Sequence, residues 1–131
     1  MVIAVDGPAG AGKSTVCRLL AEALGYTYLD TGAMYRAVAW ALSQENSAGR
    51  NTAIDAQRLS QLHLSFDIEN RTLIVYHKDK RLEDELRQPE ISQAASRISQ
   101  TAAVRVFLTE WQRKLAQKVD LVDFFIYGWT A

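Results

Sequence analysis

Hydrophobic and polar positions along the first part of the chain predict the order strand, helix, strand, helix. Val2–Val5 is a short apolar run without helical spacing, as expected for a strand buried on both faces. From Val16 to Leu24 apolar residues recur at intervals of three and four, and Gly25 is a suitable helix stop. Tyr26–Leu29 then predicts a second short strand, and Ala33–Ser43 a second helix. This order is typical of the opening of a parallel α/β sheet.

The middle of the chain has a different pattern. Asp55 is placed to cap a short helix that ends near Leu62. Leu64–Ile68 alternates apolar and polar residues, Thr72–His77 is rich in β-prone residues, and Asn70–Arg71 lies between them as a turn. These features predict a small antiparallel hairpin.

A return to helical spacing follows the hairpin. The charged run Lys78–Arg87 is interpreted as a solvated face, and Pro89 comes shortly after it. Two helices are expected, over about Glu90–Ser99 and about Ala102–Lys118, and the second carries an apolar stripe. Leu121–Tyr127 is apolar enough to form a buried strand.

Composition and charge argue against some classes of protein. The chain has 131 residues, with fifteen basic and fifteen acidic side chains and a formal net charge of zero. This balance argues against a protein that coats nucleic acid or binds membrane surfaces. Cys17 is the single cysteine, which fits a reducing compartment. No leader pattern or bilayer-length apolar run is present, so we expect a cytoplasmic protein with no membrane partner.

The segment between the first strand and the first helix matches the phosphate-loop pattern G-x-x-x-x-G-K-[ST]. Its residues, the predicted nucleotide-binding set, are Gly7, Pro8, Ala9, Gly10, Ala11, Gly12, Lys13, Ser14 and Thr15. Glycines let backbone N–H groups turn toward phosphate oxygens, and the following helix directs its positive end at the same anion. Lys13 is predicted to reach the β- and γ-phosphates of ATP, and the Ser14 hydroxyl to ligate Mg²⁺. The alternative is a glycine-rich turn between strand and helix without a binding role. It explains the presence of Lys13 and Ser14 at these offsets less well than a phosphate loop does.

Three blocks resemble one family of enzymes. The phosphate-loop region, the block Tyr28–Arg36 with its Asp-Thr-Gly-Ala-Met-Tyr-Arg sequence, and the block Leu86–Ser99 are similar to bacterial cytidylate kinases. Ala103–Arg105 continues the similarity, which runs from residue 1 to about residue 118. The phosphate loop is shared by many families, whereas the other blocks in this order are more specific. The resemblance implies a P-loop nucleoside monophosphate kinase-like α/β fold, a parallel sheet with helices on both faces and a small β-rich insert.

The resemblance also implies a transferase that moves the γ-phosphate of ATP to CMP or dCMP, with Mg²⁺ as cofactor. Lys13 and Arg36 are the expected catalytic residues, and Arg36 pairs with the acceptor phosphate. The expected substrate-binding residues are Thr31, Tyr35, Arg36, Ser96 and Arg105. Ser96 is expected to bind the cytosine edge, and Arg105 to reach the nucleotide from the long helix. The insert, from Leu64 to about Glu85, is expected to form a flap beside the monophosphate site.

Structural readings of the same residues compete with these roles. Tyr35 and Arg36 could be an ordinary aromatic and a solvated charge on a helix, and Asp30 could simply cap the turn at Asp30–Gly32. Ser96 is a common kind of helix-surface hydroxyl, and Arg105 could be a surface cation. The match of the whole block favours the functional reading, most strongly for Arg36.

The similarity to the family is expected to end near Val119. The residues that follow lack an expected Gly-Arg-Asp segment, and the arginine-rich lid of the family is absent. We therefore expect a truncated or frameshifted product with little phosphoryl transfer and an atypical apolar tail. The expected organisation is a P-loop core at 1–62, a β-rich insert at 63–88, and a helical return with the tail at 89–131. A monomer is expected. A non-catalytic nucleotide-binding remnant and another P-loop kinase, such as a shikimate or adenylate kinase, remain the alternatives.

Overall fold

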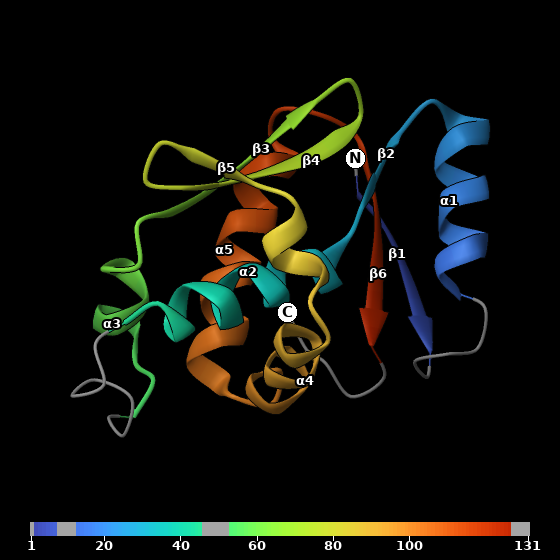
Figure 1. Cartoon of the computed structure of the whole chain (residues 1–131). Helices are drawn as coiled ribbons and strands as arrows, with labels where there is room; N and C mark the ends of the chain where they lie inside the picture. Colours follow the sequence, from blue (N-terminus) through green and yellow to red (C-terminus); the bar gives the residue numbers. More distant parts are fainter. Residues whose placement is uncertain (1, 8–12, 46–52, 127–131) are drawn as a thin grey trace.

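The computed structural model describes residues 2–7, 13–45 and 53–126. The described residues form helices, strands and the short 3-10 helix η2 (Figure 1). In chain order they are β1 (Val2–Gly7), α1 (Lys13–Leu24), β2 (Thr27–Leu29), α2 (Thr31–Ser43), α3 (Ala56–Ser60), β3 (Leu64–Glu69), β4 (Thr72–His77), β5 (Lys80–Leu82), η2 (Asp84–Arg87), α4 (Pro89–Ile98), α5 (Ala102–Ala116) and β6 (Leu121–Ile126).

The parallel sheet has the strand order β1-β6-β2, so β6 lies in its centre. Leu121 pairs with Val2 on one side and with Thr27 on the other. The predicted parallel sheet is therefore confirmed, with a strand from late in the chain between the two early strands. The predicted strand is confirmed for Leu121–Ile126 and its burial for Leu121 and Val122, while residues 127–131 of the expected tail lie outside the described residues.

Helices cover both faces of this sheet, as predicted. Leu121 is 1% exposed and belongs to the main hydrophobic cluster, which also holds buried residues of α2, α4 and α5. Its neighbour Val122 is fully buried in a second cluster with Cys17 and Ala21 of α1. Successive residues of a strand point to opposite faces, which explains the two separate clusters. Helices therefore pack on both sides of Leu121 and Val122 at the start of β6.

A second, antiparallel sheet of order β3-β4-β5 lies above the helices in Figure 1 and is called the flap below. The predicted hairpin is confirmed, with Phe66 opposite Val75 across the β3–β4 pair. Asn70 and Arg71 form its turn and have φ angles of 51° and 61°. Two consecutive left-handed residues suit the twist of a tight hairpin. The buried side chains of Phe66, Val75 and Leu82 join the flap to the main hydrophobic cluster.

The helix ends follow from local chemistry, with one correction. Gly25 adopts a φ of +69° after α1, a conformation that glycine reaches without a Cβ clash. Asp55 caps α3 as predicted, because its carboxylate accepts a hydrogen bond from the Arg58 N–H at 2.8 Å. The prediction of a turn at Asp30–Gly32 before α2 is wrong in detail. Asp30 is the N-cap itself, so Thr31 and Gly32 already belong to the helix.

Candidate functional site

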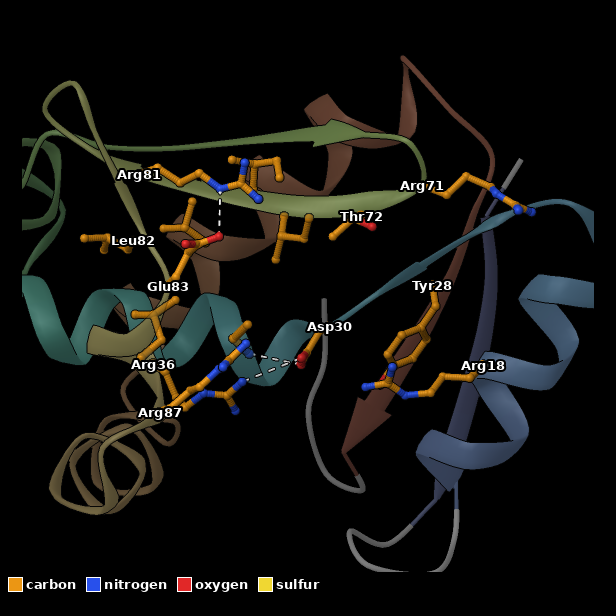
Figure 2. Close-up of a pocket in the computed structure, with 15 residues that line it drawn as sticks. Arg18, Tyr28, Asp30, Arg36, Arg71, Thr72, Arg81, Leu82, Glu83 and Arg87 are labelled. Atoms are coloured by element: carbon orange, nitrogen blue, oxygen red, sulfur yellow. Dashed lines mark hydrogen bonds and ion pairs between the residues drawn. The ribbon is translucent and has the colours of Figure 1, made fainter.

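A pocket of about 470 Å³ opens between the parallel-sheet side of the molecule and the flap (Figure 2). In Figure 2, α1 and β2 lie on one side of the pocket, the start of α2 and η2 lie on the opposite side, and β4 and β5 lie above. The lining residues are Arg18, Tyr28, Asp30, Ala33, Arg36, Arg71, Thr72, Leu73, Ile74, Val75, Arg81, Leu82, Glu83, Leu86 and Arg87. Five arginines face two carboxylates, so the described wall of the pocket is cationic and suited to an anionic ligand.

Asp30 holds the α2 side of the pocket in place. Its Oδ1 atom accepts a hydrogen bond from the Ala33 N–H at 3.1 Å, which caps the helix. Its Oδ2 atom lies 3.6 Å from the Arg36 Nη2 atom, so one carboxylate both caps the start of α2 and orients an arginine six residues further along the chain. The Arg36 side chain is 30% exposed, and its guanidinium therefore remains accessible from the pocket.

Arg18 and Tyr28 form the wall on the α1 side. The guanidinium carbon of Arg18 lies 4.8 Å from the centroid of the Tyr28 ring. A cation at this distance over an aromatic face is attracted by the ring quadrupole. Figure 2 shows the two side chains meeting across the gap between α1 and β2. The contact fixes where the long Arg18 side chain lies on an otherwise exposed helix surface.

Ion pairs order the flap side of the pocket. The Arg81 Nε atom lies 3.4 Å from Glu83 Oε1, and both residues line the pocket. Below this wall, Glu85 Oε2 lies 2.9 Å from Lys80 Nζ, and Glu85 Oε1 accepts a hydrogen bond from the Glu83 N–H at 3.0 Å. The Glu83 N–H and the Lys80 ammonium lower the pKa of Glu85 to about 2, the backbone hydrogen bond being the larger cause. Glu85 therefore stays ionised and ties β5 to η2.

The structure brings one of the five predicted substrate-binding residues to the described wall of this pocket, namely Arg36. Thr31 and Tyr35 lie beside it on α2, but both are buried, at 2% and 5% exposed. Ser96 is exposed on α4 and Arg105 is half-buried on α5. Neither is among the described residues of the pocket wall. The roles of these four residues stay predictions.

The predicted phosphate loop begins and ends within the described residues. Gly7 is the last residue of β1, and Lys13 and Ser14 are the first residues of α1, so the strand-loop-helix context is confirmed. Thr15 is exposed on the first turn of α1. Pro8, Ala9, Gly10, Ala11 and Gly12 lie outside the described residues. The start of a helix directly after the loop is the arrangement that binds phosphate groups.

A metal ion held only by protein side chains is not indicated in the described part of the chain, where no group of three or more His, Cys, Asp or Glu residues is suitably arranged. Mg²⁺ commonly keeps water ligands and binds through substrate phosphates and one or two protein oxygens. The predicted Ser14 hydroxyl, together with nucleotide phosphates, fits that mode of binding. Within the described residues, no helix combines the length and apolarity needed to cross a membrane.

Several residues of the pocket were not predicted from the sequence. The run Lys78–Arg87 was interpreted only as a solvated face, yet Arg81, Glu83 and Arg87 line the pocket. Arg87 is indeed strongly exposed, with 81% of its side-chain surface accessible. The interpretation was therefore correct about its exposure but did not predict its position at the pocket. Arg18 carried no signal beyond a cation on a helix, and Tyr28 belonged to the block Tyr28–Arg36 but was given no role of its own.

A strand, a phosphate-loop sequence and a helix beside a cationic pocket define this molecule as an α/β protein of the phosphate-binding loop class. The family model described as Cytidylate kinase matches residues 3–123, which is most of the chain. The chain therefore belongs to the cytidylate kinase family. The match extends through the first residues of β6, beyond the point where the sequence pattern was expected to end.

Curated relatives agree with this family. The cytidylate kinase of Caldanaerobacter subterraneus subsp. tengcongensis is 42% identical over 120 residues, covering 92% of this chain and 52% of that protein. The cytidylate kinase of Thermodesulfovibrio yellowstonii is 40% identical over 122 residues, covering 92% of this chain and 55% of the relative. A bifunctional pantoate ligase/cytidylate kinase of Synechococcus elongatus is 40% identical over 126 residues, covering 92% of this chain and 24% of that protein. The chain thus spans about half the length of the single-function relatives it matches.

Proposed function

We propose that this chain carries the acceptor site and the phosphate loop of a cytidylate kinase, which transfers the γ-phosphate of ATP to CMP or dCMP. The observation that carries the proposal is the placement of Arg36. This arginine lines a cationic pocket between α2 and the flap, in a chain that belongs to the cytidylate kinase family. The names of the relatives support CMP as the acceptor.

The proposed reaction breaks the bond between the γ-phosphorus of ATP and its bridging oxygen, and forms a bond from that phosphorus to an acceptor phosphate oxygen. Catalysis of such a transfer consists mainly of positioning and of stabilising negative charge. Arg36 would hold the acceptor phosphate, oriented by Asp30 at 3.6 Å. Lys13 would bind the β- and γ-phosphates of ATP, within the loop Gly7–Thr15. Mg²⁺, held by Ser14 and the phosphates, would neutralise part of their charge.

The pyrimidine contacts belong to the same proposal. Thr31 and Tyr35 are close to Arg36 along α2, and Ser96 and Arg105 lie on α4 and α5. The insert 63–88 would act as the acceptor-side unit between the core segments 1–62 and 89–131. This division is supported by the pocket-wall residues that come from the flap and from η2, between Arg71 and Arg87. We also propose that the protein works in the cytoplasm as a monomer, on free nucleotides, in pyrimidine metabolism.

The proposal is tested by thermal unfolding with separate ligands. CMP should raise the melting temperature more than AMP or shikimate, because a ligand that binds only the folded state stabilises it by mass action. Arg36→Met should remove the difference between CMP and AMP. Arg113→Met, which removes an exposed cation from α5, serves as the matched control and should keep the CMP response. A larger shift with AMP than with CMP would contradict the proposal.

A second candidate is nucleotide binding without phosphoryl transfer. The chain spans 52% and 55% of two cytidylate kinase relatives, so binding and transfer by these residues alone are tested separately. Loss of one arginine from phosphoryl-transfer machinery can cost about 10³-fold or more in turnover. A coupled assay of ADP release with CMP distinguishes the two candidates. The 131-residue polypeptide should be compared with the same residues joined to the remaining half of a relative. Comparable turnover of the two would exclude the binding-only candidate.

A further inference from the structure

The arginines of the pocket differ in how their charge is compensated. Arg36, Arg81 and Arg87 each lie within 4 Å of a carboxylate, with separations of 3.6 Å to Asp30, 3.4 Å to Glu83 and 3.7 Å to Asp84. Arg18 and Arg71 line the same pocket and have no carboxylate partner in the part of the chain that the structure describes. An anion entering the pocket would therefore gain most from these two guanidinium groups.

Arg18 is the better ordered of the two. Its guanidinium carbon lies 4.8 Å from the centroid of the Tyr28 ring. A guanidinium carries five N–H donors, so a contact with one ring leaves donors available for phosphate oxygens. Arg71, by contrast, lies at the exposed tip of the β3–β4 hairpin.

The position of Arg18 links the two halves of the proposed site. It lies on α1, the helix that begins with Lys13 at the end of the phosphate loop, and it faces the pocket that also contains Arg36. Figure 2 shows Arg18 on the α1 side and Arg36 on the α2 side, with Asp30 between them. A phosphate bound at Arg36 would therefore sit in a space bounded by a second guanidinium on the opposite wall.

We propose that Arg18 is a second phosphate-binding residue of the acceptor site, and that Tyr28 is the positioning residue that holds it there. The inference rests on the proposed function and names the ligand class more narrowly. Two guanidinium groups on opposite walls favour the dianionic phosphate of a nucleoside 5′-monophosphate over the uncharged nucleoside. Arg18 lies outside the blocks that carry the family resemblance, and Tyr28 begins one of them but was given no role from the sequence.

The test compares the affinities of CMP and cytidine, measured by isothermal titration calorimetry on the full chain. Arg18→Gln should weaken CMP binding by about tenfold, the scale of one lost charge-assisted hydrogen bond, and leave cytidine binding unchanged. Tyr28→Leu keeps Arg18 but removes the aromatic ring that contacts its guanidinium, and should weaken CMP binding by about two- to fivefold. Tyr28→Phe keeps the ring and should restore CMP affinity to near that of the wild type.

Controls separate this inference from a structural effect and from failure of the proposed function. Arg113→Gln removes an exposed arginine far along α5 and should leave both affinities unchanged. If Arg36→Met weakens CMP binding but Arg18→Gln does not, the inference about Arg18 is overturned and the proposed acceptor site stands. Equal losses for CMP and cytidine in Arg18→Gln would also overturn it, because they would indicate a structural effect. Absence of CMP binding by the wild type would overturn both proposals.

Discussion

At the scale of single residues, Asp30 and Arg36 depend on the small size of Gly32. A Cβ atom at Gly32 would lie 3.1 Å from Arg36 Nη1 and 3.3 Å from Asp30 Oδ1. Both separations are tighter than ordinary van der Waals contact, so the ion pair would have to shift by a few tenths of an ångström. The absence of a side chain at this position therefore lets the guanidinium lie across the first turn of α2.

Gly32→Ala should consequently separate stability from binding. Alanine is favoured over glycine in helices by up to about 1 kcal/mol, so the melting temperature should stay the same or rise. CMP affinity should fall by about three- to tenfold, because the displaced Arg36 no longer meets the phosphate in its present orientation. Titration calorimetry combined with thermal unfolding measures both quantities. Ser43→Ala, near the other end of α2, is the control and should bind CMP like the wild type.

The sequence identified Arg36 but not the wall that faces it. A local block of residues along one helix is visible in a sequence, and Arg36 belongs to such a block. The contact of Arg18 with Tyr28 exists only because α1 packs beside β2. A pairing of that kind depends on tertiary structure, and neither residue alone differs from an ordinary surface cation or strand aromatic.

At the scale of elements, the flap is tied to η2 by the ionised carboxylate of Glu85. Its ordinary pKa of 4.5 is lowered to about 2 by the Glu83 N–H and Lys80. A carboxyl group with a lowered pKa in the folded state stabilises the fold above its unfolded pKa. That contribution declines as the pH falls from about 4.5 and is lost below about 2.

Glu85→Gln should therefore change the acid sensitivity of the protein. The wild type should be more stable than the variant at pH 6, and the difference should shrink steadily between pH 4.5 and pH 2. Urea unfolding at a series of pH values provides the free energies of unfolding. Glu110→Gln, at an exposed position within α5, is the control for the loss of one surface carboxylate. A constant offset between wild type and Glu85→Gln at every pH would contradict the assigned role of Glu85.

Most elements could be predicted because their signals are local, and the exceptions show where such signals fail. The two consecutive strands of the hairpin had alternation and a turn, and both were found. The strand β5 was not predicted, because Lys80–Leu82 is three residues long and mostly charged. Only the adjacent β4, which pairs Val75 with Leu82, makes this segment a strand. The start of α2 was placed too late because Asp-Thr-Gly resembles a turn until its capping hydrogen bond is seen.

At the scale of the whole molecule, β6 joins the two hydrophobic clusters. Leu121 faces the cluster of α2, α4 and α5, whereas Val122 faces α1. The sequence predicted a strand here but could not give its place, because sheet order is set by which strands pair and not by any pattern within one strand. The pairing of β6 with both β1 and β2 places it in the middle of the sheet.

Leu121→Ala should test the central position of β6. Deleting a fully buried leucine side chain costs about 2–5 kcal/mol, depending on how far the cavity collapses. We expect a loss of this size in the free energy of unfolding, measured with urea. Val106→Ala removes a side chain that is 59% exposed and should change stability by less than about 0.5 kcal/mol. A loss for Leu121→Ala as small as that of Val106→Ala would mean that β6 does not lie between β1 and β2.

The central place of β6 also has a consequence for synthesis in the cell. β1 and β2 leave the ribosome early, and among the strands that the structure describes each pairs with β6 and not with the other. These two strands are therefore made before their shared partner, which follows after almost a hundred further residues, from Leu29 to Leu121. The flap and its helices are complete before that point and can fold as a unit. Chaperones that cover exposed strand edges would thus act on the first thirty residues, although these are the residues that carry the phosphate loop.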